Sequence, residues 1–421
     1  MKRKCKHIDI TDWKSIRIYV ALCVFRHKKR HDFRKLLIKH GVTKQEYNQA
    51  LKTMDYSSFL PAIDSIAREA AESIKNRKLD LPPVSIREKI DSTTGKIRMI
   101  GKESAMQQVY DHIAVGAAKE IWDSRMVPQQ MSSIPKRGQV KGMKLIRKYI
   151  RDDNRATRYA KAHGIRYTRK CRHHVKLDVH LCYPNADMYI FMELFRHDCG
   201  NQDVIWLWET LLRSHRVDGY TGFMIGALPS QWAAQFMLSF IYRKAMELYY
   251  VRRGKRYKKI SHMVMFMDDM QLFGSSRKQL MSAVRELISY ARDTLGFEIK
   301  TNFAIHDIDI TPINMMGFVI YGNGKVEMRE RNYIKSRRIV MRYEAEGKLV
   351  YSQAQRLNSY KGFYKYSDSR KATMEMNLKE VFDYCSKVIS YQDKKRKEKQ
   401  NESNQSILFG RAGSDPVHAE I

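Results

Sequence analysis

The pattern of apolar and polar positions is most informative in residues 263–274, which read MVMFMDDMQLFG. Two apolar runs flank the acidic pair Asp268 and Asp269, which predicts a buried β-hairpin with both carboxylates at its turn. Burying adjacent carboxylates costs several kcal/mol per ion unless positive charge lies on them. A divalent cation would supply that charge. The alternative is a solvent-exposed Asp-Asp turn between two core strands.

A second strand is expected in residues 173–187, HHVKLDVHLCYPNAD, where three apolar residues alternate with Lys176 and Asp178. Side chains two positions apart share one face of a strand, so the apolar residues should face the core while Asp178 points elsewhere. Further along, a helical pattern follows Gly226 and continues to Gly254. We expect Ser230 to cap this helix and Gly226 to permit a tight backbone turn close to a ligand.

The chain before these segments is expected to be helical over residues 1–80, with a capping box from Thr43 to Glu46. Residues 84–101 then predict a β-hairpin, because turn residues separate two alternating runs. Lys96 and Arg98 lie on the same side of its second strand. This basic row fits a triphosphate clamp, although a solvated edge strand often carries such charges as well.

The remaining segments are mostly helical in pattern. Helices are expected over 103–122, after the loop Pro135–Gly138, and over 277–293, followed by a short hairpin from Met315 to Gly324. The loop at Pro135–Gly138 carries Arg137, and its backbone and cations are suited to approach phosphates. From Arg331 the pattern is helical and basic. Beyond Gln392 the composition is too polar to pack, which predicts disorder.

The net charge of the chain indicates what kind of partner it binds. The 421 residues include 78 Lys and Arg against 45 Asp and Glu, a formal net charge of +33, with 24 Tyr and 16 Phe. Such an excess indicates a polyanionic partner, and aromatic residues beside cations suit nucleic acid better than they suit a merely soluble basic protein. The apolar run Ile18 to Phe25 is too short to span a membrane and lacks a cleavage site, so we expect no membrane association.

The six cysteines are scattered without a CxxC pair, which favours a reduced cytoplasmic compartment. One cluster offers ligands for zinc: Cys171, His173, His174, His180 and Cys182. Alternation along a strand sends these side chains to different faces, and their spacing matches no standard zinc finger. We therefore do not expect a zinc site there.

Taken in order, several segments closely resemble the sequence motifs of reverse transcriptases. The matching segments are KIRMIGKESAMQQVY (96–110) and 132–151 for the fingers, LDVHLCYPNAD (177–187) for motif A, IGALPSQ (225–231) for motif B, FMDD (266–269) for motif C, LGFEIKTN (295–302) for motif D and MMGF (315–318) for motif E. The resemblance covers about residues 85 to 390, and its specificity comes from the order of seven motifs.

This resemblance implies an α+β fold, a right-hand polymerase with fingers, a palm and a helical thumb. The palm would be an antiparallel sheet with helices on one face. The implied divisions are a helical N-terminal extension (1–80), fingers (81–170), palm (171–325), thumb (326–391) and a disordered tail (392–421).

The resemblance also assigns catalytic residues. Asp178 and Asp268 would hold two Mg²⁺ ions, with Mn²⁺ as a substitute, and Asp269 would support them. Tyr183 falls where the family keeps an aromatic gate that excludes a ribose 2′-hydroxyl. Lys300, in LGFEIKTN, matches the motif D lysine that protonates the pyrophosphate leaving group.

Further residues would contact the incoming nucleotide. Triphosphate-facing cations are expected at three positions, Lys96, Arg98 and Arg137. Motif B contributes Gly226, Ser230 and Gln231 beside the incoming and templating bases.

The implied activity is RNA-directed DNA synthesis, with an RNA template, an RNA–DNA duplex and dNTPs as partners and a basic accessory protein as a further one. Motif B and the segment SYKGFYKYSDS (359–369) resemble diversity-generating retroelement enzymes and related prophage enzymes. Three alternatives stay open: an antiviral, abortive-infection reverse transcriptase, an RNA-binding protein with an inactive polymerase fold, and an RNA-directed RNA polymerase. The intact acidic residues disfavour the second, and Tyr183 disfavours the third.

Overall fold

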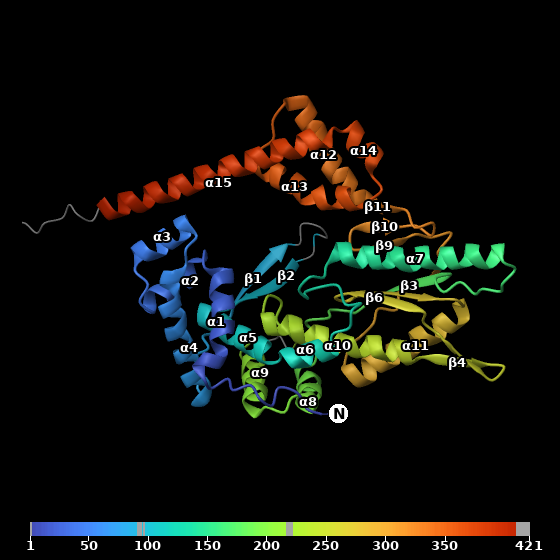
Figure 1. The fold of residues 1–421 in the computed structure, drawn as a ribbon, viewed down its shortest axis with the longest axis horizontal. Helices are drawn as coiled ribbons and strands as arrows, with labels where there is room; N and C mark the ends of the chain where they lie inside the picture. The colour runs from blue at the N-terminus through green and yellow to red at the C-terminus, as the bar shows by residue number, and fades with distance from the viewer. Residues whose placement is uncertain (1, 91–94, 96, 216–221, 410–421) are drawn as a thin grey trace, which may run out of the picture. The chain divides into compact units, whose positions relative to one another are not determined.

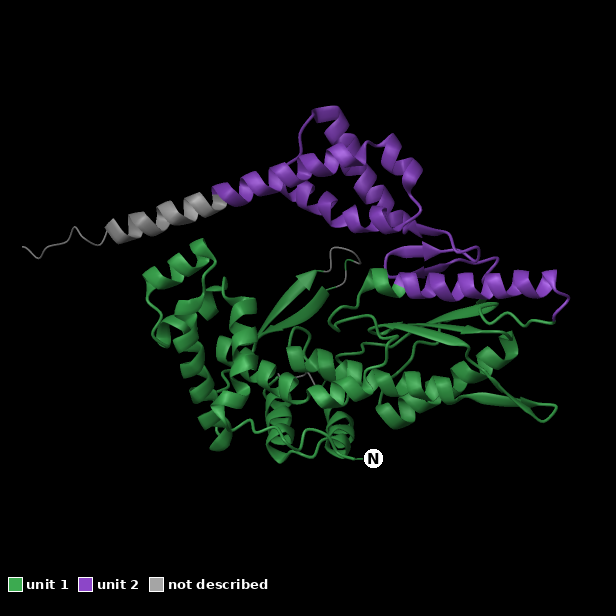
Figure 2. Ribbon diagram, viewed as in Figure 1, with its two compact units in different colours: residues 1–142, 166–307 green, residues 143–165, 308–421 purple. Residues whose placement is uncertain are grey.

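The computed structural model describes residues 2–90, 95, 97–215 and 222–409, with side chains up to residue 395. The chain forms two compact units, which Figure 2 distinguishes by colour. Unit 1 comprises residues 1–142 and 166–307, and unit 2 comprises residues 143–165 and 308–421. The expected division into extension, fingers, palm, thumb and tail stays a prediction.

Unit 1 begins with four α-helices, as the sequence predicts, and Figure 1 shows them in blue. They are α1 (Trp13–His27), α2 (His31–Lys39), α3 (Lys44–Thr53) and α4 (Leu60–Lys75). Asp12 caps α1 by accepting hydrogen bonds from the backbone N–H groups of Lys14 and Ser15. The predicted capping box between Thr43 and Glu46 is present at the start of α3.

The predicted hairpin follows as β1 (Ser85–Ile90) and β2 (Ile97–Lys102), which pair antiparallel. Residues 91–94 and Lys96 lie outside the described residues, so the position of Lys96 is not known. The next segment, expected as one helix, forms α5 (Ala105–Ala117) and α6 (Lys119–Arg125). Ala118 separates them because its backbone departs from helical geometry, with φ −88° and ψ 14°.

An antiparallel sheet of four strands lies at the centre of unit 1, in the order β6-β7-β3-β8. Its strands are β3 (His173–Asp178), β6 (His262–Phe266), β7 (Asp269–Gly274) and β8 (Ile305–Asp307). Both predicted core strands are therefore confirmed. Their apolar side chains join a core that also contains α8 (Met188–Asp198), α9 (Gln202–Ser214), α10 (Leu228–Glu247) and α11 (Arg277–Leu295). The fold is α+β, as expected.

A second, exposed hairpin follows α10 and was not predicted. It consists of β4 (Tyr249–Arg252) and β5 (Lys255–Lys258). The helical pattern was expected to continue to Gly254, but α10 ends at Glu247. Arg253 and Gly254 both have positive φ, +50° and +71°, and form the two-residue turn between Arg252 and Lys255. Positive φ at both central positions is typical of the tight turns that match the twist of paired strands.

Unit 2 contains most of α7 (Gln139–Ala162) together with a small sheet and four helices. These elements are β9 (Ile313–Met315), β10 (Phe318–Ile320), β11 (Val326–Met328), α12 (Glu330–Glu346), α13 (Tyr351–Tyr366), α14 (Arg370–Glu375) and α15 (Leu378–Phe409). Arg147 on α7 donates to the carbonyl oxygen of Gly324 at 2.9 Å and to the carboxylate of Asp368 at 3.0 Å. These bonds attach α7 to the sheet of its own unit.

Helix α15 continues to Phe409, whereas the sequence predicted disorder from residue 392. Lys, Glu, Gln and Arg dominate this stretch, and they have good helix propensity even though they offer little apolar surface for packing. Residues 410–421 lie outside the described residues. Among the described helices, none combines the length and the apolar composition that crossing a membrane requires.

Candidate active site

Strand register brings the three predicted acidic residues to one end of the central sheet. Asp178, the last residue of β3, lies directly opposite Asp269, the first residue of β7. Phe266 on β6 also pairs with Asp269, so Met267 and Asp268 form the turn between β6 and β7. Directly opposed residues present their side chains on the same face of a sheet. Asp178, Asp268 and Asp269 therefore form one acidic site.

Burial makes the negative charge of Asp268 costly. Its pKa is raised above the ordinary value, chiefly by desolvation and further by the charges of Asp269 and Asp178. The nearby charge of Arg98 acts in the opposite direction and lowers the pKa. A cation at this end of the sheet would thus be favoured electrostatically, as the sequence analysis expected from buried carboxylates.

Two lysines supply positive charge to the site. The ammonium of Lys176 lies 2.7 Å from a carboxylate oxygen of Asp269, and that of Lys300 pairs with the carboxylate of Asp178. The backbone N–H of Lys300 also donates to the carbonyl oxygen of Asp178 at 2.9 Å. The predicted Lys300 is therefore placed at the site. Sequence reasoning gave Lys176 no role, although its position two residues before Asp178 on the same strand face was a usable signal.

The three carboxylates do not close around a single point, because Asp178 and Asp269 each turn toward a lysine. Within the described residues, the groups of three or more donor side chains whose ligand atoms all lie within 4.8 Å of one another are found elsewhere in unit 1. The site thus offers carboxylates spread over two strand ends and a turn.

Tyr183 follows β3 and packs against the turn that carries Asp268. Its hydroxyl donates to the sulfur of Met267 at 3.7 Å, and burial raises the pKa of its phenol. The carbonyl oxygen of Tyr183 accepts a hydrogen bond from the backbone N–H of Phe223 at 2.8 Å. A Cβ on the neighbouring Gly222 would lie 2.0 Å from the carbonyl oxygen of Pro184, so only glycine fits there. Tyr183 is therefore held beside the acidic residues.

The predicted tight turn at Gly226 is confirmed, with φ +116°. The backbone of β2 lies close to Gly226. A Cβ at Gly226 would lie 2.7 Å from the carbonyl oxygen of Gly101, whose N–H donates to the carbonyl oxygen of Ile225 at 2.9 Å. The requirement for glycine in this structure thus comes from the hairpin β1–β2 and needs no ligand.

The prediction that Ser230 caps α10 is wrong. Ala227 occupies the N-cap position and Pro229 lies in the first turn, so Ser230 is already the third helical residue. Proline is favoured at a helix start because its φ is preset and its missing N–H has no partner to lose. Ser230 is fully buried, and within the described structure its hydroxyl has no hydrogen-bond partner. Gln231 follows it and is half-buried.

A buried glutamine pair contacts the turn between β6 and β7, and the sequence analysis did not predict it. Gln235, one turn after Gln231 on α10, donates from its amide to the sulfur of Met267 at 3.0 Å. The amide of Gln130 donates to the side-chain oxygen of Gln235 at 2.8 Å. Because the two residues are distant in sequence, local pattern gives no sign of this contact. It fixes Met267 and thereby the position of Asp268.

The two described finger cations lie in different surroundings. Arg98 is close enough to lower the pKa of Asp268, which places its charge beside the acidic site. The guanidinium of Arg137 instead donates to the carbonyl oxygens of Val127 and, at 3.0 Å, Gln130. In this structure Arg137 holds the backbone that precedes it, and its expected contact with a triphosphate stays a prediction.

Comparisons with known proteins give limited information. No protein-family model matches the chain, and no curated protein matches it significantly in sequence. The chain is similar to the solved structure of telomerase from Candida albicans in complex with a TWJ fragment of telomeric RNA. The sequence identity is 10% and the TM-score is 0.42, and the match covers 91% of this chain and 82% of that chain. It is also similar to apo telomerase from Candida tropicalis truncated from the C-terminal domain, with 11% identity, coverage of 78% and 84%, and a TM-score of 0.40. Likenesses this weak assign no function, which must be argued from the site.

Proposed function

We propose that this protein is an RNA-directed DNA polymerase that copies an RNA template into cDNA by nucleotidyl transfer. The observation that carries the proposal is the register of the central sheet, which sets Asp178 opposite Asp269 with Asp268 in the adjoining turn. The order of the sequence motifs around these residues and the net charge of +33 support it.

The donor set of the site fits Mg²⁺, which prefers carboxylate oxygens and is bound through one or two carboxylates plus substrate phosphates. The raised pKa of Asp268 agrees with a buried carboxylate that gains from a cation. Asp178 and Asp268 would hold two Mg²⁺ ions, or Mn²⁺ in their place, with Asp269 in support. Bound there, the ions would lower the pKa of a primer hydroxyl and stabilise charge on the transferring phosphoryl group.

The other residues of the site would position the nucleotide and manage charge. Arg98, whose charge already reaches Asp268, would bind the triphosphate, with Lys96 and Arg137 as further cations. Lys300 carries an ammonium at Asp178, from which it would donate a proton to the departing pyrophosphate. Tyr183, packed on the turn, would block space for a ribose 2′-hydroxyl. Gly226, Ser230 and Gln231 would lie beside the paired bases.

Primer extension tests this proposal. Purified full-length protein, a 5′-labelled DNA primer annealed to an RNA template, dNTPs and Mg²⁺ should give template-directed extension that chelation of Mg²⁺ abolishes. If the protein binds the RNA but extends no primer, with Mg²⁺ or Mn²⁺ and with several primer types, an RNA-binding protein with an inactive polymerase fold would be favoured. Extension only with rNTPs would identify an RNA polymerase.

Within this class, we place the enzyme among diversity-generating retroelement reverse transcriptases, on the basis of IGALPSQ and the segment 359–369. The motif B turn at the start of α10 would lie beside the incoming and templating bases, so its shape would affect how strictly base pairing is enforced. Sequencing of cDNA made on a defined RNA should show misincorporation concentrated opposite template adenines, with a basic accessory protein added. Equal error rates opposite all four bases would favour the antiviral reverse transcriptase.

Lys176 offers a test of the metal assignment that does not depend on losing activity. Replacing Lys176 with Met removes the ammonium that competes with a cation for Asp269. We expect the Mg²⁺ concentration for half-maximal extension to fall about threefold to tenfold, since the pair is partly exposed and screened. The exposed Lys278 on α11 provides the matched control, Lys278→Met, which should leave this concentration unchanged. A half-maximal concentration that stays the same or rises in Lys176→Met would contradict the assignment.

A further inference from the structure

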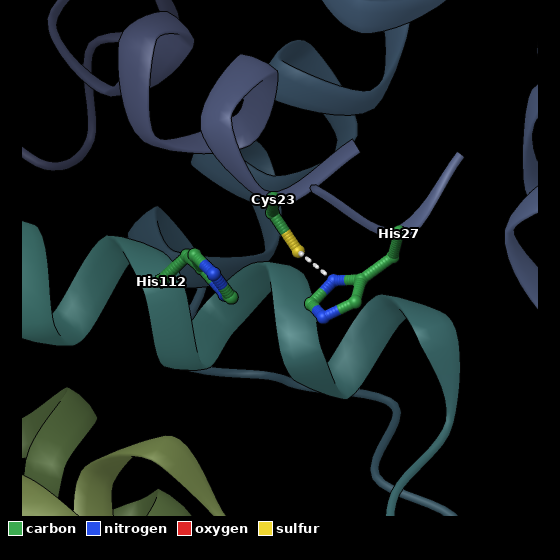
Figure 3. Close-up of side chains that lie close together, drawn as sticks. All are labelled: Cys23, His27 and His112. Carbon is green, nitrogen blue, oxygen red and sulfur yellow. Dashed lines mark hydrogen bonds between the residues drawn. The ribbon is translucent and has the colours of Figure 1, made fainter. Parts of the chain in front are cut away.

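Three side chains of unit 1, outside the acidic site, converge where α1 packs against α5. Cys23 and His27 lie one turn apart on α1, and His112 projects from α5 (Figure 3). One ligand atom from each of the three lies within 4.8 Å of the others. The proposed polymerase chemistry uses none of them.

The spacing matches a tetrahedral metal centre. The sulfur of Cys23 lies 3.8 Å from Nδ1 of His27. Zinc bonds of about 2.3 Å to sulfur and 2.0–2.1 Å to nitrogen, at a tetrahedral angle, put these two donor atoms about 3.6 Å apart. Only a small adjustment of the Cys23 and His27 side chains would therefore be needed to place both donors on one ion.

His112 is held in a tautomer that suits ligation. Its Nδ1 lies 2.9 Å from the carbonyl oxygen of Gln108, which can only accept, so Nδ1 carries the proton and Nε2 keeps a free lone pair. A backbone carbonyl bonded to the second ring nitrogen is the usual way in which proteins orient a metal-binding histidine. The same carbonyl lies 3.5 Å from the sulfur of Cys23. Gln108 thus aligns two of the three donors.

Arginines near the cluster oppose a cation, but one of them is compensated. The charges of Arg26 and Arg30 both act on Cys23. Arg30 forms an ion pair with Asp32, its Nε lying 3.1 Å from the carboxylate. Its net repulsion of a metal is therefore reduced.

A second buried group, Glu103, Asp111 and His215, offers oxygen-rich ligands close by. Nε2 of His215 already lies 2.8 Å from a carboxylate oxygen of Glu103, so this group is paired internally. Cys23, His27 and His112 carry no carboxylate, and a thiol with two imidazoles is a donor set that suits Zn²⁺.

We propose that Cys23, His27 and His112 bind one Zn²⁺ ion, which joins α1 of the N-terminal helices to α5. Binding would displace the thiol proton of Cys23 to solvent and form bonds from the thiolate and the two ring nitrogens. His27 and His112 are only half-buried, so water completes the fourth position. The ion contributes to stability by cross-linking two helices that are far apart in sequence.

Cobalt(II) provides a direct probe, because it takes zinc sites and absorbs visible light. Full-length protein stripped with a chelator should bind about one equivalent of Co²⁺ with the intense visible bands of a tetrahedral centre and a near-ultraviolet thiolate band, and Zn²⁺ should bleach both. Zn²⁺ should also raise the Tm of the stripped protein. Cys23→Ser should lose the thiolate band, and His112→Gln should weaken Co²⁺ binding at least about tenfold.

Matched controls separate this site from other thiols and histidines. Cys385→Ser changes a buried cysteine of unit 2, and His163→Gln changes an exposed histidine just after α7, and both should bind Co²⁺ as the unmodified protein does. Circular dichroism of each stripped variant shows whether it is folded, and His27→Gln gives an independent third variant. Absence of a tetrahedral Co²⁺ spectrum in the unmodified protein would overturn the proposal. So would a spectrum that survives Cys23→Ser but disappears in Asp111→Asn.

Discussion

Asp178→Asn and Asp268→Asn should each lower kcat for DNA synthesis by about 10³-fold or more, a rise of about 4 kcal/mol in the activation barrier. Asparagine keeps the shape of the side chain but removes the charge that holds a cation. The backbone contacts of both positions, such as the bond from Lys300 N–H to the Asp178 carbonyl oxygen, do not depend on the carboxylate. The fold and RNA binding should therefore be nearly unchanged.

Single-nucleotide extension at saturating dNTP measures this loss, and Tm and RNA binding report on the fold. Asp293→Asn is the matched control, because Asp293 is an exposed residue of α11 that pairs only with its neighbour Arg292 among the ion pairs described. Its kcat should equal that of the unmodified protein. Activity of either active-site variant within about tenfold of normal would refute the assignment of these aspartates as metal ligands.

Tyr183→Ala should raise the ratio of kcat/KM for rNTPs to that for dNTPs by about tenfold to a hundredfold. The expected gate works by volume: the ring, held against Met267, fills the space that a 2′-hydroxyl would occupy. Removing the ring opens that space. Separate measurement of kcat/KM for one rNTP and the matching dNTP gives the ratio directly.

Tyr183→Phe separates volume from hydrogen bonding. Phenylalanine keeps the ring but loses the hydroxyl that contacts the sulfur of Met267. A gate that acts by volume leaves the ratio for this variant close to normal. If Tyr183→Ala reduces the use of dNTPs without changing the ratio, the ring supports the nucleotide from beneath and does not select the sugar.

The sequence predicted the acidic site well because its geometry follows from local rules. A period of two assigns the faces of β3, and two short apolar runs predict the hairpin. Its turn is Met267 and Asp268, whereas Asp269, which was also expected in the turn, is the first residue of β7. Once β3 and β7 pair, Asp178 and Asp269 must share a face. The start of helix α3 was similarly predictable, because its capping box depends only on the four consecutive residues from Thr43 to Glu46.

Other features escaped because they depend on contacts between distant segments. The bond between Gln130 and Gln235 leaves no local pattern in the sequence. Ser230 was misread because a serine near a helix start is a common cap, but Pro229 let the helix begin earlier. The turn at Gly254 was misread for a related reason, since glycine both ends helices and forms hairpin turns.

The contact between Gly101 and Gly226 has a mechanical consequence. A Cβ at Gly226 would lie 2.7 Å from the carbonyl oxygen of Gly101, and the N–H of Gly101 is bonded to the carbonyl oxygen of Ile225. The close approach and this hydrogen bond couple the position of the hairpin β1–β2 to the turn at the start of α10. Arg98 lies on β2, three residues before Gly101. In the proposed polymerase, a misfitted base pair that displaced the turn at Gly226 would also shift β2 and move the charge of Arg98 relative to Asp268.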